Sequence, residues 1–337
     1  LEGFTYGSVN APTGKEWESP ENLALNKEQP HAYFFPFQHL DNARKVLPEN
    51  SKYWQSLDGD WKFHWAPDPD SRPKDFYQTE YDVSSWDAIP VPSSWNIYGI
   101  QKDGSQKYGT PIYVNQPVIF QHSVKVDDWR GGVMRTPPAN WTTYKDRNEV
   151  GSFRRDFEIP QDWDGREVFI SFDGVDSFFY LWINGQYVGF SKNSRNTANF
   201  NITPYLQKGK NTVAAEVYRS SDGSFLEAQD MFRLPGIFRT VALYSVPKVY
   251  FRDLVATPDL DATYTDGSLT VNAEIRNLDK KAIKDYKVYY SLYANKLYSD
   301  ENTLVDGFLS PVIDKIAPNE TGSVQTVLKV KAPNKWS

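Results

Sequence analysis

An Asn-Gly pair between two apolar runs is the feature that most restricts the fold of this 337-residue chain. The runs cover residues 178–183 and 187–190, and Asn184-Gly185 lies between them. A type I′ turn needs a positive φ at both central residues, and Asn and Gly adopt that conformation readily. The pattern is therefore the strongest short-range signal for a β-hairpin. It predicts antiparallel β-structure in the middle of the chain.

Other short apolar segments surround this hairpin. Trp61, Phe63 and Trp65 alternate with polar residues, as in a half-buried strand. Three further segments are rich in β-branched, small apolar and aromatic residues. They cover residues 168–172, 213–218 and 241–244. Because no segment carries a sustained helical period, the sequence predicts an all-β domain, either a jelly roll or another two-sheet sandwich.

The pattern changes near Val246-Pro247-Lys248. Beyond this point tryptophan is missing until Trp336, and three segments alternate between apolar and polar residues. These segments are 269–276, 286–292 and 324–330. Their size and rhythm are typical of an immunoglobulin-like sandwich. We therefore predict a jelly-roll domain over 46–246, followed by an immunoglobulin-like β-sandwich domain over 247–337.

Two stretches lack a strand pattern. Residues 1–45 are polar and turn-rich and include an aromatic segment with a proline at each end. Because proline is excluded from central strands, we predict an extended N-terminal arm that lies on another surface. Residues 126–150 form a long irregular stretch, and long loops are uncommon unless functional or mobile. Its Trp129 and Trp141 are interpreted as structural residues, with a sugar platform or a domain contact as the alternative.

Composition argues against several classes of function. A net charge of −6 with interspersed acids and bases does not suit a phosphate backbone, so no nucleic-acid partner is expected. No apolar stretch reaches the ~18 residues typical of a membrane span. Without cysteine there are no disulfides or thiolate ligands. The four histidines have neither metal-ligand spacing nor an adjacent carboxylate, which argues against a metal site or a Ser-His-Asp triad.

Glu227 and Asp230 are the obvious candidates for an acidic catalytic pair, because they lie in a polar loop beside Arg233. Carboxylates near arginines are, however, common structural ion pairs. We interpret both as structural partners of Arg233 or Arg239 that hold the loop to the sheet. The tryptophans of the predicted strands are likewise interpreted as core residues. They are Trp61, Trp65, Trp95 and Trp182.

A series of short sequence motifs, rich in aromatic and turn-forming residues, extends over nearly the whole chain. In order they are Trp17-Glu18-Ser19-Pro20, Leu57-Asp58-Gly59-Asp60-Trp61, Val91-Pro92-Ser93-Ser94-Trp95, Pro111-Ile112-Tyr113-Val114-Asn115, Phe172-Asp173-Gly174-Val175-Asp176-Ser177, Ser221-Asp222-Gly223-Ser224, Gln229-Asp230-Met231 and Gly236-Ile237-Phe238-Arg239. Together they resemble the sugar-binding domain of glycoside hydrolase family 2, and its bacterial β-galactosidase branch in particular. The resemblance implies a galactose-binding-like jelly roll followed by an immunoglobulin-like domain.

The resemblance also implies where the chemistry lies. Retaining enzymes of this kind use two carboxyl groups about 5 Å apart, and in this family both are glutamates of a (β/α)₈ barrel. We expect that barrel to follow residue 337, so that this portion carries no catalytic residue and is inactive alone. The parent enzyme is expected to hydrolyse terminal non-reducing β-D-galactosides. The alternatives are a freestanding carbohydrate-binding module and a family 2 enzyme of other specificity, such as a β-glucuronidase.

Two asparagines are the predicted substrate-binding residues. Asn115 matches a family asparagine that contacts the sugar, and an amide both donates to and accepts from hydroxyls; the alternative is a loop residue bonded to its own backbone. A family aspartate that also ligates sodium aligns with Asn193. A neutral amide beside Lys192 puts Na⁺ binding in question. The parent enzyme is otherwise expected to use Mg²⁺, with no cofactor held by this portion.

The remaining expectations concern assembly and compartment. The N-terminal arm resembles segments that reach across subunits in the family, so a homo-oligomer is expected beside the missing barrel as a partner. Many such enzymes act on foraged glycans at the cell envelope. This favours the bacterial periplasm or cell envelope over the cytoplasm.

Overall fold

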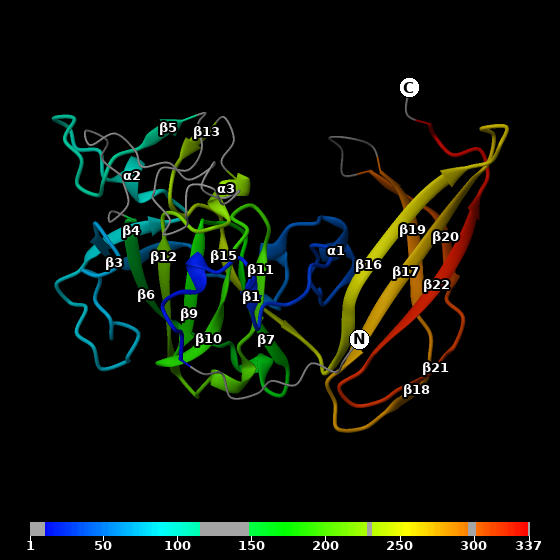
Figure 1. Ribbon diagram of the computed structural model, residues 1–337. Helices are drawn as coiled ribbons and strands as arrows, with labels where there is room; N and C mark the ends of the chain where they lie inside the picture. Colours follow the sequence, from blue (N-terminus) through cyan, green and yellow to red (C-terminus); the bar gives the residue numbers. More distant parts are fainter. Residues whose placement is uncertain (1–10, 115–147, 228–230, 296–300, 336–337) are drawn as a thin grey trace. The chain divides into compact units, whose positions relative to one another are not determined.

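The computed structural model describes residues 11–114, 148–227, 231–295 and 301–335 (Figure 1). Contacts divide these residues into two compact units. The first unit consists of residues 11–28 and Trp54–Ser245, and the second of Gln29–Tyr53 and 246–335. The regular structure is almost entirely β-strand, as predicted. The predicted domain boundaries after residues 45 and 246 stay predictions.

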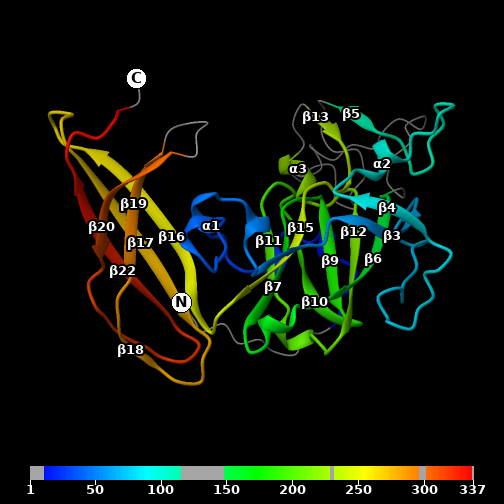
Figure 2. The same ribbon diagram turned by 180° about the vertical axis from the view of Figure 1, so that it is seen from behind.

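Two antiparallel sheets make the first unit a jelly-roll sandwich (Figure 2). The larger sheet contains, in spatial order, β1 (Ala24–Leu25), β10 (Gln186–Ser191), β9 (Phe178–Ile183), β12 (Lys210–Tyr218), β6 (Val150–Glu158), β3 (Gly59–Ala66) and β4 (Asp87–Val91). The smaller sheet contains β11 (Ala198–Asn201), β7 (Glu167–Phe172), β15 (Val241–Val246) and β2 (Trp54–Ser56). The strands predicted at residues 61–65, 168–172, 213–218 and 241–244 are thereby confirmed.

Short elements gather at one end of this sandwich (Figure 1). They are α2 (Trp95–Tyr98), α3 (Ser224–Glu227), the pair β5 (Ile112–Val114) with β13 (Met231–Arg233), and the pair β8 (Val175–Asp176) with β14 (Gly236–Ile237). Single 3₁₀ turns, η1 (Glu16–Glu18), η3 (Gln161–Trp163) and η4 (Thr203–Tyr205), complete the unit.

The predicted hairpin is confirmed. Strands β9 and β10 pair in antiparallel register with Ile183 opposite Gln186. The two turn residues, Asn184 and Gly185, have φ values of 50° and 77°. These positive values are what a type I′ turn requires, which is why the Asn-Gly pair is informative in the sequence.

Both faces of β9 are buried, so its sequence reads as a continuous apolar run instead of an alternating one. On one face, the ring of Phe179 lies 4.8 Å from that of Phe172 and 6.0 Å from that of Phe200, both in the smaller sheet. The other face belongs to an outer aromatic layer. Its rings are those of Trp17, Phe76, Tyr77, Tyr81, Trp86, Phe178, Tyr180, Trp182, Tyr187, Phe190 and Tyr218. This second layer accounts for much of the aromatic content.

Residues 11–28 cover part of the outer aromatic layer. The ring of Trp17 stacks on that of Tyr218 at 5.5 Å between centroids. Strand β1 adds to the edge of the larger sheet, with Ala24 opposite Ser191. This segment therefore packs on the sheet of its own chain. Of the predicted core tryptophans, Trp61, Trp95 and Trp182 are buried, whereas Trp65 is only half-buried. Trp129 and Trp141 lie outside the described residues.

The second unit is an immunoglobulin-like β-sandwich. Its strands are β16 (Val249–Leu260), β17 (Gly267–Asn277) and β22 (Thr321–Val330) in one sheet, with β18 (Ile283–Tyr286), β21 (Ile313–Ile316), β19 (Tyr289–Asn295) and β20 (Asn302–Leu309) in two strand pairs. It also contains α1 (Leu40–Arg44) and η2 (Pro48–Asn50). Alternate residues of β17, Val271, Ala273 and Ile275, are buried, as its sequence predicts. The single strand predicted at 286–292 is not formed, because residues 287–288 interrupt it between β18 and β19.

Gly236 begins the phrase Gly236-Ile237-Phe238-Arg239 and has a backbone that only glycine adopts easily, with φ at 138°. A Cβ there would lie 2.5 Å from the carbonyl oxygen of Ser93. We expect Gly236→Ala to lower the free energy of unfolding by about 2 kcal/mol, because strain and overpacking add. Urea denaturation measures the change.

Gly104→Ala is the matched control. Gly104 also has a positive φ, at 82°, but no atom lies within 4 Å of the added Cβ. Its cost should be about 1 kcal/mol or less. Equal losses in the two variants would contradict the close approach to Ser93.

Candidate functional site

The structure places one of the two predicted substrate-binding residues. Asn193 is exposed in the loop after β10 and has a φ of 77°. Asn115 lies outside the described residues, and so does most of the stretch 126–150. The residue before Asn115 is Val114, which pairs with Met231 at the end of the β5–β13 ladder.

The loop that carries Asn193 is anchored on both sides. Before it, the ammonium of Lys192 is buried, pairs with Asp222 at 2.7 Å, and donates to the carbonyl oxygen of Ser19 at 2.6 Å. Burial lowers the pKa of Lys192, while Asp222 opposes that effect. After it, the backbone N–H and hydroxyl of Ser194 donate to the two carboxylate oxygens of Glu227 at 2.7 and 2.6 Å. Asn193 is therefore held in place between two bonded neighbours.

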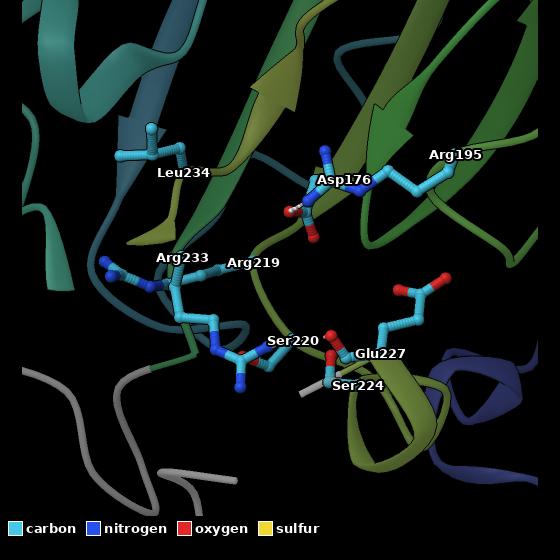
Figure 3. Close-up of a pocket in the computed structure, with 8 residues that line it drawn as sticks. All are labelled: Asp176, Arg195, Arg219, Ser220, Ser224, Glu227, Arg233 and Leu234. Carbon is cyan, nitrogen blue, oxygen red and sulfur yellow. Dashed lines mark hydrogen bonds and ion pairs between the residues drawn. The ribbon is translucent and has the colours of Figure 1, made fainter. Parts of the chain in front are cut away.

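A charged cluster, which we call the charged rim, lies directly beside this loop (Figure 3). It consists of Asp176, Arg195, Arg219, Ser220, Ser224, Glu227, Arg233 and Leu234. Arg195 extends its guanidinium to Asp176, with Nη2 3.6 Å from Oδ2. The cavity between these residues measures about 20 Å³, which is room for about one water molecule. It does not admit a sugar ring, so the cluster can act only as the border of a larger site.

Asp176 is the electrostatically unusual member of the charged rim. Its side chain is only 15% exposed, and burial raises its pKa to about 6. Arg195 opposes this increase, whereas the carboxylate of Glu227 adds to it. A carboxyl group that is partly protonated near neutral pH is a frequent property of functional sites.

The predicted ion pairs of Glu227 are corrected in detail. Its carboxylate accepts from Ser194, and Arg233 donates instead to the backbone oxygen of Glu227, at 3.3 Å. Arg239 donates to the backbone oxygen of Arg195 at 2.8 Å. Arg233 thus joins β13 to α3, and Arg239 joins the loop between β14 and β15 to the loop after β10, both through carbonyl oxygens. Asp230 lies outside the described residues.

The sequence did not predict a buried hydrogen-bonded cluster next to the charged rim. We call this cluster, which consists of Glu149, Arg219, Trp95 and Asn96, the hub. Arg219 donates to Glu149 at 2.7 Å and to the carbonyl oxygen of Thr110, next to β5, at 3.0 Å. The other oxygen of Glu149 accepts from Trp95 and Asn96 of α2, at 3.0 and 3.1 Å. No local pattern marks a pair separated by 70 residues. The hub ties α2, the start of β6, the end of β12 and the approach to β5 together.

Two general features can be stated for the described part of the chain. It holds no group of three or more His, Asp or Glu side chains arranged to bind a metal ion. It also has no helix with the length and apolar character needed to cross a membrane.

Comparison with known proteins identifies the family to which the chain is similar. The model of the glycosyl hydrolases family 2 sugar binding domain matches residues 54–247. A β-galactosidase of Priestia megaterium is 38% identical over 323 residues, which are 96% of this chain and 29% of the relative. A β-galactosidase of Halalkalibacterium halodurans is 36% identical over 77% of this chain and 24% of the relative. The chain thus spans less than a third of the length of these relatives.

Solved structures show the same fold. The β-glucuronidase of Bacteroides uniformis matches with a TM-score of 0.61 at 19% identity, over 84% of this chain and 28% of that protein. A β-glycosidase of Bacteroides vulgatus matches with a TM-score of 0.54 at 21% identity, over 84% of this chain and 30% of that protein. At these identities the likeness concerns the fold alone.

Proposed function

Because the chain belongs to glycoside hydrolase family 2, whose sugar binding domain it contains, we propose that it is a non-catalytic portion of a retaining β-galactosidase. In this proposal a further domain of the same enzyme hydrolyses terminal β-D-galactosides. The present portion borders the pocket for the terminal sugar, and Asn115 and Asn193 offer their amides to its hydroxyls.

One observation carries the proposal. The loop of Asn193 is bonded to α3 through Glu227, and β13, which follows α3, pairs with the strand that leads into Asn115. Strand β5, which precedes Asn115 in sequence, and the loop of Asn193 are thus bonded to neighbouring elements, β13 and α3. A border of this kind needs rigid support more than a pocket of its own.

Exposed apolar side chains at the same end support the docking of a further domain. Leu226 in α3 is 83% exposed, and Met231 and Phe232 in β13 are 38% and 57% exposed. Large apolar groups exposed together are typical of interaction surfaces.

The proposed substrate specificity is based on the relatives with the higher sequence identity. The relatives at 33–38% identity are named β-galactosidases, whereas the β-glucuronidases resemble this chain at 17–19% identity. We therefore favour galactosides over glucuronides. Asn193 offers a neutral amide where the family resemblance implies an aspartate, so we propose no sodium site in this portion. The Mg²⁺ and the homo-oligomer expected of the parent enzyme stay predictions.

An activity assay tests the proposal. The 337-residue chain should release no aryl alcohol from an aryl β-galactoside, because it contributes only to the border of the site. The same chain extended by the coding sequence that follows residue 337 should release it. The extended enzyme should also cleave the aryl β-galactoside faster than the aryl β-glucuronide. Hydrolysis by the shorter chain alone, or a preference for the glucuronide, would contradict the proposal.

A further inference from the structure

A second hollow in the first unit shares no residue with the charged rim. It has a volume of about 380 Å³, which lies within the range of small-molecule sites. Strand β3, the loop before β4 and the segment before β5 provide its walls. The lining residues are Phe63, His64, Trp65, Tyr81, Ser85, Trp86, Asp87, Lys107 and Tyr108.

Aromatic rings form one wall of this hollow. Trp86 packs on the buried Phe76 of the outer aromatic layer, at 5.8 Å between ring centroids. The rings of His64 and Tyr81 flank it at 5.3 and 6.1 Å. Trp86 and Tyr81 are only half-buried, although they belong to an otherwise buried layer. The wall therefore offers a supported aromatic surface to a ligand.

Charged groups also line the hollow. The two oxygens of the Asp87 carboxylate accept from Lys107 and from the hydroxyl of Tyr108, both at 2.7 Å. These bonds lower the pKa of Asp87, so the carboxylate is ionised at neutral pH. Burial lowers the pKa of His64, which keeps its imidazole neutral there. One carboxylate and one ammonium give the lining no net charge, which favours a neutral ligand.

The hollow is held in shape without a ligand. The guanidinium of Arg154 donates to four carbonyl oxygens of the loop before β4. They are those of Phe76, Gln78, Thr79 and Tyr81, at 2.9–3.3 Å. Lys62 donates to the carbonyl oxygens of Ser84 and Trp86, at 3.2 and 3.4 Å. A wall fixed in advance reduces the conformational entropy that binding would otherwise cost.

We propose that this hollow binds a neutral pyranose ring and gives the chain a second carbohydrate contact, separate from the charged rim. The apolar C–H face of the sugar packs on Trp86, and its hydroxyls bond to Asp87, Lys107 and Ser85. The inference does not depend on catalysis and goes beyond the proposed function.

Isothermal titration calorimetry of the 337-residue chain with lactose tests the inference. We expect millimolar binding, weakened about tenfold or more in Asp87→Asn, because a hydrogen bond to a charged group is lost. Trp86→Leu, which keeps an apolar contact with Phe76, should weaken binding similarly. Asp164→Asn is the matched control, because Asp164 is exposed and does not line the hollow, and it should bind lactose like the wild type. Thermal unfolding confirms that each variant is folded.

The outcomes separate this inference from the proposed function. Absence of binding, or wild-type binding in both Asp87→Asn and Trp86→Leu, would overturn the hollow as a site. Loss of binding in Asn193→Ala alone would assign the sugar to the rim and overturn the hollow as well. Glucuronic acid should bind more weakly than lactose, and the reverse order would contradict a neutral ligand.

Discussion

Replacing Glu149 by Gln is expected to destabilise the first unit by about 3–5 kcal/mol, the cost of breaking a buried ion pair by removing one partner. The side chains of Glu149 and Arg219 are 4% and 1% exposed. The substitution leaves the guanidinium of Arg219 buried without a counter-charge. It also places an amide donor opposite other donors, because Arg219, Trp95 and Asn96 all donate to the carboxylate. A donor that faces a donor in the interior loses its hydrogen bond without gaining water.

Urea denaturation followed by tryptophan fluorescence measures this effect in the relevant unit. All tryptophans except Trp336 precede residue 246, so the signal reports on the jelly roll. Glu158→Gln is the matched control, because Glu158 lies exposed at the end of β6, the strand that begins directly after Glu149. It should change the free energy of unfolding by less than about 0.5 kcal/mol. A loss below about 1 kcal/mol in Glu149→Gln would show that the hub does not stabilise the fold.

The consequence of this substitution should extend to the charged rim. Arg219 lines the rim cavity and also fixes the carbonyl oxygen of Thr110, just before β5. A displaced Arg219 would therefore loosen the strand that pairs with β13. The hub joins the stability of the sandwich to the geometry of its functional end.

Much of the fold could be predicted from local patterns. The Asn184-Gly185 turn, the strand around Trp61 and the alternation of Val271, Ala273 and Ile275 each depend on neighbours within a few residues. Backbone sterics and the two-residue period of a strand act at that range. Many short sequence motifs, which occur in the same order as in the family, then indicate the two sandwich types.

The outer aromatic layer could not be predicted from local patterns. The run 178–183 reads as apolar throughout, and its second buried face is covered by Trp17 and by the loop containing Phe76. Those segments lie far from it in sequence. A continuous apolar run indicates that both faces are buried, but it does not identify what covers them.

The candidate site was predictable only in part. The resemblance points to Asn193, whose loop lies next to the charged rim, and its contact with a sugar stays a prediction. The anchors of that loop, Lys192 with Asp222 and Ser194 with Glu227, join residues about 30 positions apart. In the sequence Lys192 is only a charge beside Asn193, whereas in the structure its ammonium is buried against Asp222. Charge pairing through the fold decides such details, and single-sequence patterns do not contain it.

The second large effect concerns Asp176, where we expect Asp176→Asn to stabilise the chain at neutral pH. Burial raises the pKa of this carboxyl from an ordinary value of 3.8 to about 6. The native state therefore holds the proton more tightly than the unfolded state does. The resulting stabilisation is fully present below pH 3.8 and is lost as the pH rises through 6. Above that pH the chain bears the cost of a buried carboxylate, which amounts to about 3 kcal/mol for such a difference in pKa.

An asparagine cannot ionise and so avoids that cost. The free energy of unfolding of Asp176→Asn should therefore exceed that of the wild type by up to about 3 kcal/mol at pH 7.5, and the two should converge near pH 4. Urea denaturation at half-unit steps between pH 4 and 8 gives the difference curve. Asp164→Asn, at an exposed position after η3, is the control for the substitution itself. A variant less stable than the wild type at pH 7.5 would show that Arg195 more than offsets the burial of Asp176. The expected gain would instead mean that the charged rim keeps an acidic group at a cost in stability, as functional sites commonly do.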